Sequence, residues 1–168
     1  MFKPLTLGFT VLGFVLASGL PASGQSQDFS PTYTWHGELV AVDAAAGTIT
    51  VKSRLVGTAM GEVKNLKAGQ RVLLHWSGFD KTADAVWRVT AGSAEAAAND
   101  RFLFPVELVG PEVEHDYATV RFTAPSAALD QVRSLEPGTW VTVTARQRPG
   151  AEADAVVSLA PYVKEPAA

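Results

Sequence analysis

The stretch YTWHGELV at residues 33–40 decides the fold, because it returns as FLFPVELV at residues 102–109. Aromatic residues occupy alternate positions in both copies, and the ending Glu-Leu-Val is identical. Alternation of this kind is typical of a β-strand with one buried face and one polar face. The first copy therefore predicts that Tyr33, Trp35 and Leu39 face a core while His36 and Glu38 face away from it.

Further pairs of similar segments follow in the same order along the chain. They are 48–51 with 119–122 after a small slip, 66–72 with 135–141, and 83–86 with 153–156. Matches in constant order at nearly constant spacing are the signature of an internal repeat. The sequence predicts one repeat over residues 33–90, a linker of small and polar residues over 91–100, a second repeat over 101–163, and a short tail over 164–168.

Each repeat predicts four strands and one short helical segment. Met60, Val63 and Leu66 recur every three residues between the second and third strands, and Leu129, Val132 and Leu135 do so in the second repeat. Gly69 and Gly138 predict tight turns into the strands that follow. The expected fold class is all-β, with two tandem OB-like small β-barrels. One eight-stranded antiparallel barrel built from both repeats is the alternative, because two four-stranded units can also close as eight.

The N-terminal residues 1–24 have the pattern of a secretory signal peptide. Lys3 precedes an apolar run over residues 5–16, and Ala22-Ser23-Gly24 supplies the small residues of a cleavage site. The apolar run is shorter than the roughly 20 residues that a permanent membrane span needs. We expect cleavage near Gly24, a flexible start over residues 25–32, no permanent membrane span, and a periplasmic or secreted protein.

Composition excludes several classes of function. The chain has no cysteine, which excludes disulfides, thiolate chemistry and a lipidated cysteine, and mildly favours a bacterial periplasm. The net charge is −3 with no run of like charges. Nucleic-acid binding depends on neutralising phosphates with a basic surface, so no nucleic-acid partner is expected.

The order of strands and the Leu-x-x-Gly-x-x-Val motif at residues 66–72, with residues 37–43 and 47–51, resemble small OB-like barrels of exported bacterial proteins. These include periplasmic copper chaperones of metal-efflux systems. That family binds Cu(I) with a histidine, a Met-x-Met pair and a tryptophan. Here Met60 is the only methionine outside the signal segment, so the family's metal motif is not retained.

Two kinds of candidate site follow from the residues. Imidazoles suit copper or zinc, and a thioether suits Cu(I), so His36 and His75 with Met60 form a candidate metal site. The alternative places Met60 in the apolar row as core filling and the histidines on the surface.

The tryptophan at position 140 is the second kind of candidate. It shares a face with Thr142 and Thr144, so its ring is expected to point outward. There it could contact a sugar or a protein together with Arg146, or it could pack against the other barrel. Phe79, in an expected loop at residues 77–80, is a further candidate contact. The remaining aromatic residues at core-like positions are expected to fill the interior: Tyr33, Trp35, Trp76, Trp87, Phe102 and Phe104.

Catalysis has little support in the sequence. His115-Asp116 follows two glutamates and is the only candidate acid–base group, and neither a nucleophile elbow nor a phosphate loop accompanies it. The sequence therefore predicts a non-enzymatic, exported binding or scaffold module of the bacterial envelope that needs no cofactor and has an envelope protein or a glycan as its partner. The alternative function is the handling of copper or zinc in the periplasm.

Overall fold

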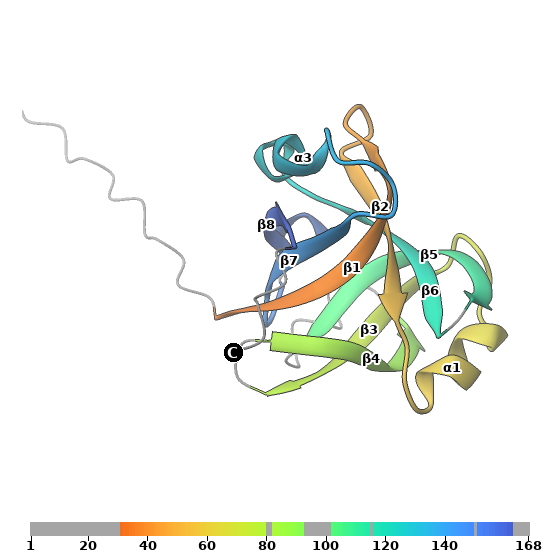
Figure 1. Cartoon of the computed structure of the whole chain (residues 1–168). Helices are drawn as coiled ribbons and strands as arrows, with labels where there is room; N and C mark the ends of the chain where they lie inside the picture. Colours follow the sequence, from red (N-terminus) through yellow and green to blue (C-terminus); the bar gives the residue numbers. More distant parts are fainter. Residues whose placement is uncertain (1–30, 80–81, 93–101, 115, 150, 163–168) are drawn as a thin grey trace, which may run out of the picture.

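The computed structural model describes residues 31–79, 82–92, 102–114, 116–149 and 151–162. The predicted signal peptide, most of the linker, His115 and the whole predicted tail lie outside these ranges. The described chain is all-β with a few short helical segments (Figure 1). Within these ranges, no helix is long and apolar enough to cross a membrane.

The order of strands and α-helices is the same in both segments of the chain, while the 3-10 helices stand at different places. The first segment contains β1 (Thr32–Asp43), β2 (Thr48–Arg54), α1 (Ala59–Glu62), η1 (Val63–Asn65), β3 (Arg71–Phe79) and β4 (Thr82–Ala91). The second contains β5 (Leu103–Glu114), β6 (Tyr117–Thr123), α3 (Ser126–Val132), β7 (Trp140–Arg146), η2 (Glu152–Asp154) and β8 (Val156–Pro161). The predicted helical segments after the second strand of each repeat are therefore confirmed.

Strands from the two segments are interleaved in one eight-stranded sheet with the order β2-β6-β5-β3-β4-β1-β7-β8. All pairings are antiparallel except a short parallel one between β1 and β4. The expectation of two separate tandem barrels is therefore corrected, because β2 pairs with β6, β3 with β5 and β1 with β7. The sheet also does not close as eight strands. Instead β2 pairs additionally with β1, and β7 and β8 extend beyond that junction (Figure 1).

The pairing pattern repeats itself when each residue is replaced by its counterpart in the other segment. Glu38 pairs with Trp140, and Glu107 pairs with Arg71. Glu107 lies 69 positions after Glu38, and Arg71 lies 69 positions before Trp140. The backbone N–H of Gly69 donates to Leu108 O at 2.8 Å, and that of Gly138 donates to Leu39 O at 2.8 Å. Both glycines have positive φ, 78° and 89°, a region that favours glycine. The two predicted turns are thus built in the same way.

The second strands also correspond, but without the slip that the sequence comparison introduced. Leu39 pairs with Val51, and Leu108 pairs with Val120, so Val51 corresponds to Val120 rather than to Phe122. In this register Ser53 occupies the position equivalent to Phe122. Matching apolar residues by similarity introduces the slip, because it places Val51 against Phe122. The true counterpart of Phe122 is the buried polar residue Ser53.

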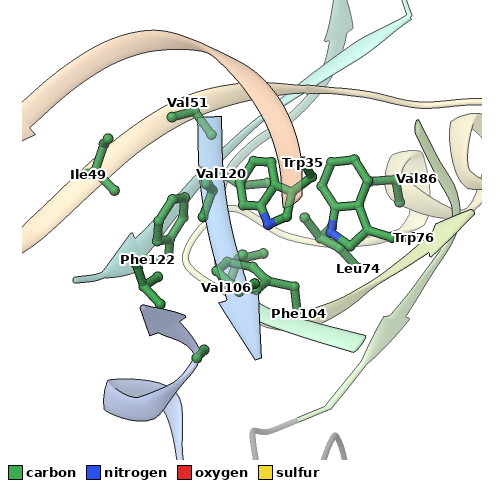
Figure 2. Close-up of a cluster of buried hydrophobic side chains, with 14 of the residues drawn as sticks. Trp35, Ile49, Val51, Leu74, Trp76, Val86, Phe104, Val106, Val120 and Phe122 are labelled. Carbon is green, nitrogen blue, oxygen red and sulfur yellow. The ribbon is translucent and has the colours of Figure 1, made fainter. Parts of the chain in front are cut away.

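The core lies between the curved strands and is rich in aromatic rings (Figure 2). Trp35 stacks on Trp76 with ring centroids 4.7 Å apart, and Phe104 and Phe122 meet Trp35 at 5.1 and 5.6 Å. Tyr33 is buried beside this group, and its burial raises the pKa of the phenol well above its usual range. The predicted inward face of β1 is therefore confirmed, and it draws rings from both segments into one core.

The hydroxyl of Ser53 is a weak point of this core. Ser53 is fully buried, and its Oγ makes no hydrogen bond within the described structure. Leaving a buried hydroxyl unpaired costs about 1–3 kcal/mol. We expect Ser53→Ala to raise the free energy of unfolding by about 1 kcal/mol in urea denaturation, because alanine removes the unpaired group. A loss of stability would show that the hydroxyl has a partner.

Candidate functional site

The predicted outward face of β7 is confirmed, and it is the centre of an aromatic surface. Val141, Val143 and Ala145 are buried, while the residues between them are partly exposed. Trp140, at the start of this strand, contacts Tyr117 of β6 with ring centroids 6.1 Å apart in an edge-on arrangement. Trp140 is thus held at one edge by a second ring rather than lying alone on the strand.

A second ring pair, His36 and Tyr162, lies beside Trp140. His36 belongs to β1, and Tyr162 directly follows β8. The backbone N–H of Tyr162 donates to Trp140 O at 2.9 Å, which holds Tyr162 beside β7. The Tyr162 ring packs on His36 at 4.3 Å, and His36 Nδ1 lies 3.1 Å from Thr142 Oγ1. We call His36, Tyr117, Trp140, Thr142 and Tyr162 the Trp140 surface.

The sequence predicted Trp140 and Thr142 on one outward face, and it named His36 only as part of the metal-site hypothesis. Tyr117 and Tyr162 were missed, because strand alternation shows which way a residue faces and not which strand lies beside it. Arg146, predicted as a companion of Trp140, is at the other end of β7. Six strand residues span roughly 20 Å, so Arg146 is not part of the Trp140 surface.

The equivalent face on β3 and β5 is built differently. His36 of β1 pairs with Thr142 of β7. Their counterparts Pro105 of β5 and Leu73 of β3 pair with each other in the same way. Leu73 packs with Leu103, and both are buried, 4% and 5% exposed. Gly92 corresponds to Tyr162, and a Cβ there would lie 2.8 Å from Leu73 Cδ1. Leu73 and Leu103 are therefore buried on one face, while its counterpart carries partly exposed rings and hydrogen-bonding groups.

Trp87 is 46% exposed, which corrects the prediction that it fills the core. The cause is a β-bulge in β4. His75 pairs with Arg88, but the next residue, Trp76, pairs with Val86, so Trp87 is an extra residue without a partner on β3. A bulge breaks strict alternation and turns Trp87 and Arg88 to the same exposed side.

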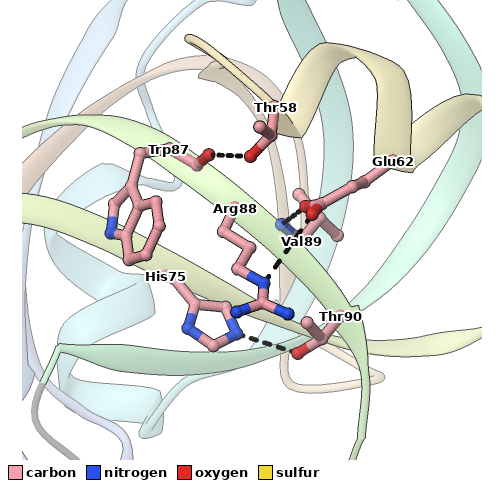
Figure 3. Close-up of polar contacts among 7 residues, drawn as sticks. All are labelled: Thr58, Glu62, His75, Trp87, Arg88, Val89 and Thr90. Atoms are coloured by element: carbon pink, nitrogen blue, oxygen red, sulfur yellow. Dashed lines mark hydrogen bonds and ion pairs between the residues drawn. The ribbon is translucent and has the colours of Figure 1, made fainter.

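Several polar contacts surround this bulge (Figure 3). His75 Nε2 lies 2.8 Å from Thr90 Oγ1, and the His75 ring meets Trp87 edge-on at 6.0 Å. Glu62 Oε2 accepts the backbone N–H of Val89 at 2.7 Å, and its Oε1 lies 3.7 Å from Arg88 Nε. We call Glu62, His75, Trp87, Arg88 and Thr90 the bulge surface.

The three predicted metal ligands lie in different environments. His36 contacts Thr142 and Tyr162, whereas His75 contacts Thr90 and Trp87. Met60 packs against the hydrophobic core from α1, in agreement with the alternative that treats it as core filling. In the parts of the chain that the structure describes, no group of three or more histidine, cysteine, aspartate or glutamate side chains is placed to hold a metal ion.

The remaining candidates can be placed only in part. Phe79 is the last residue of β3, pairing with Thr82, so the expected loop at residues 77–80 is corrected to a strand that ends at Phe79. Its side chain lies outside the described part of the structure, as does His115. No protein-family model, curated protein or solved structure matches this chain.

Proposed function

We propose that this protein is an exported, non-enzymatic binding module of the bacterial cell envelope, and that the Trp140 surface contacts its partner, an envelope protein or a glycan. The N-terminal pattern of Lys3, an apolar run and small residues supports export. The concentration of rings beside hydrogen-bonding side chains supports recognition, because tyrosine and tryptophan combine a large apolar contact with polar groups.

The observation that carries the proposal is the difference between two equivalent faces of the same sheet. The β1–β7 face has the partly exposed His36, Trp140 and Thr142. Their counterparts on the β3–β5 face are Pro105 and Leu73, which are buried, and the exposed Arg71. Side-chain pairs on neighbouring strands contribute only roughly 0.2–1 kcal/mol each to the stability of a sheet. The presence of the rings of the Trp140 surface on only one of two matching faces supports a role in contact with another molecule.

The recurrence of pairs, turns and one ion pair supports an origin of the chain by internal duplication. Glu38 lies 4.0 Å from Lys52, and the equivalent Glu107 lies 3.5 Å from Arg121. After duplication the two copies share one sheet, so a change on the outer face of one copy leaves the core intact. The Trp140 surface, where His36 of the first copy meets residues of the second, is accordingly a specialised place in the shared sheet and not a property of the fold.

Replacing Trp140 by alanine is the direct test. We expect the variant to lose no more than about 1–2 kcal/mol of stability, because Trp140 is only partly buried and lies outside the hydrophobic core. We expect it to lose at least tenfold in affinity for the partner, which is the usual effect of removing a central aromatic contact. Binding is measured with envelope glycans and with envelope proteins captured by a photo-crosslinker placed at Tyr117.

The matched control uses the equivalent position on the β3–β5 face. Arg71→Ala, which replaces the counterpart of Trp140, is expected to leave affinity unchanged. Equal affinity of the Trp140→Ala variant and the unmodified protein for the same partner would remove the Trp140 surface from the account.

A further inference from the structure

The bulge in β4 has a counterpart in the second segment, which makes it a feature of the fold and not an irregularity. In β8, Thr144 pairs with Ser158 but Ala145 pairs with Val156, so Val157 is the extra residue. Val157 is 42% exposed, as Trp87 is 46% exposed. Both bulges therefore turn one apolar residue outward, but only the first presents a large ring beside a cation. Bulges often re-aim side chains at binding sites.

The cation beside Trp87 has a carboxylate as its neighbour. Arg88 Nε faces Glu62 Oε1 at 3.7 Å, and Glu62 is itself held by the Val89 backbone N–H. The two terminal nitrogens of the guanidinium lie on the side away from Glu62, towards His75 and Thr90 (Figure 3). The Arg88 side chain is about half exposed, at 51%. A planar fork of N–H donors is thus presented next to an exposed indole.

We propose that the bulge surface is a binding site for an acidic saccharide, a sugar that bears a carboxylate. The terminal N–H groups of Arg88 donate to the carboxylate as a bidentate pair, the geometry that guanidinium and carboxylate share. The apolar face of the sugar ring stacks on Trp87. His75 supports the indole from its edge, and Thr58 Oγ1 donates to Trp87 O at 3.0 Å, which fixes the bulged backbone.

The charges at the site favour this ligand over other anions. A single arginine matches a single carboxylate, while phosphate polymers are recognised by several cations together. Glu62 does not compete for the terminal N–H groups in this arrangement, because its contacts are to Arg88 Nε and to the Val89 N–H. A neutral sugar would stack on Trp87 but leave the guanidinium fork without an acceptor. The proposal does not depend on the Trp140 surface.

The test compares two disaccharides that differ only in their carboxylates, digalacturonate and its neutral galactose analogue. Each is titrated into isotopically labelled protein, and the Trp87 indole N–H and Arg88 Nε–H resonances are followed. We expect digalacturonate to shift both resonances and to bind at least tenfold more tightly than the neutral sugar, since hydrogen bonds to charged groups are the stronger kind. Arg88→Gln should abolish this preference, and Trp87→Ala should weaken binding of both sugars at least tenfold.

A control variant separates this site from others. Arg133 is also exposed and paired with a carboxylate, Asp130 at 3.1 Å, so Arg133→Gln removes a similar cation elsewhere. This variant should not change the affinity for digalacturonate. Equal affinity for the two sugars, binding that survives Arg88→Gln unchanged, or no shift at Trp87 with either sugar would each overturn the proposal.

Discussion

Replacing Trp35 by alanine is expected to lower the free energy of unfolding by about 3–5 kcal/mol, the range for truncating a large buried ring. Trp35 is fully buried, and it contacts Trp76, Phe104 and Phe122 at ring-centroid distances of 4.7–5.6 Å. Alanine would remove the ring that joins these three. The loss is measured by urea denaturation at constant denaturant slope.

The matched variant is Trp35→Phe. The indole nitrogen of Trp35 has no hydrogen-bond partner in the described core, so phenylalanine keeps a ring and removes an unpaired donor. We expect this variant to lose less than about 1.5 kcal/mol, as for a near-conservative apolar exchange. A loss below about 1 kcal/mol for Trp35→Ala would contradict the packing described for the core.

Replacing Phe122 by alanine should destabilise both segments of the chain together. Phe122 belongs to the second segment, yet its ring lies between Trp35 of the first segment and Phe104 of the second, at 5.6 and 5.0 Å. We expect a loss of about 3–5 kcal/mol. Because one sheet contains both segments, hydrogen exchange of the slowest amides in β3 and in β7 should accelerate by the same factor.

Separate domains would respond differently to this substitution. If residues 33–90 folded independently of residues 101–163, β3 amides would keep their protection while β7 amides lost theirs. Exchange of the two strands at clearly different factors would therefore contradict the shared core.

Much of the local structure was predictable from the sequence. The alternation in β1 and β7 predicted which side chains are buried, the three-residue spacing around Val63 and Val132 predicted the short helical segments, and Gly69 and Gly138 marked tight turns. These features depend on neighbours within a few residues. Period and turn chemistry report such short-range requirements directly.

The arrangement of the strands was not predictable in the same way. Alternation fixes the face of a strand but not its neighbour, so the repeats were read as two barrels, although β2 pairs with β6 and β1 with β7. The contacts of Trp140 with Tyr117 and of His36 with Tyr162 depend on this long-range pairing. They could be found only after the strands were in place.

The exposure of Trp87 was missed for a different reason. One extra residue in β4 reverses the alternation beyond Val86, and no residue type at the bulge marks it in the sequence. Its counterpart in β8 gives the same shift: Val157 is exposed between the buried Ala155 and Leu159, as Trp87 is between the buried Ala85 and Val89.

The interleaved sheet, on which the whole account depends, is tested most directly by a cross-link between β2 and β6. Lys52 and Thr119 are directly opposite each other in these antiparallel strands, where Cα atoms are about 4.5–5.5 Å apart. Disulfides need about 4.4–6.8 Å, and the chain has no cysteine of its own. The variant Lys52→Cys with Thr119→Cys should form an intramolecular disulfide in the folded monomer and melt at a higher temperature when oxidised. Two free thiols, or disulfides only between molecules, would show that the two segments do not share a sheet.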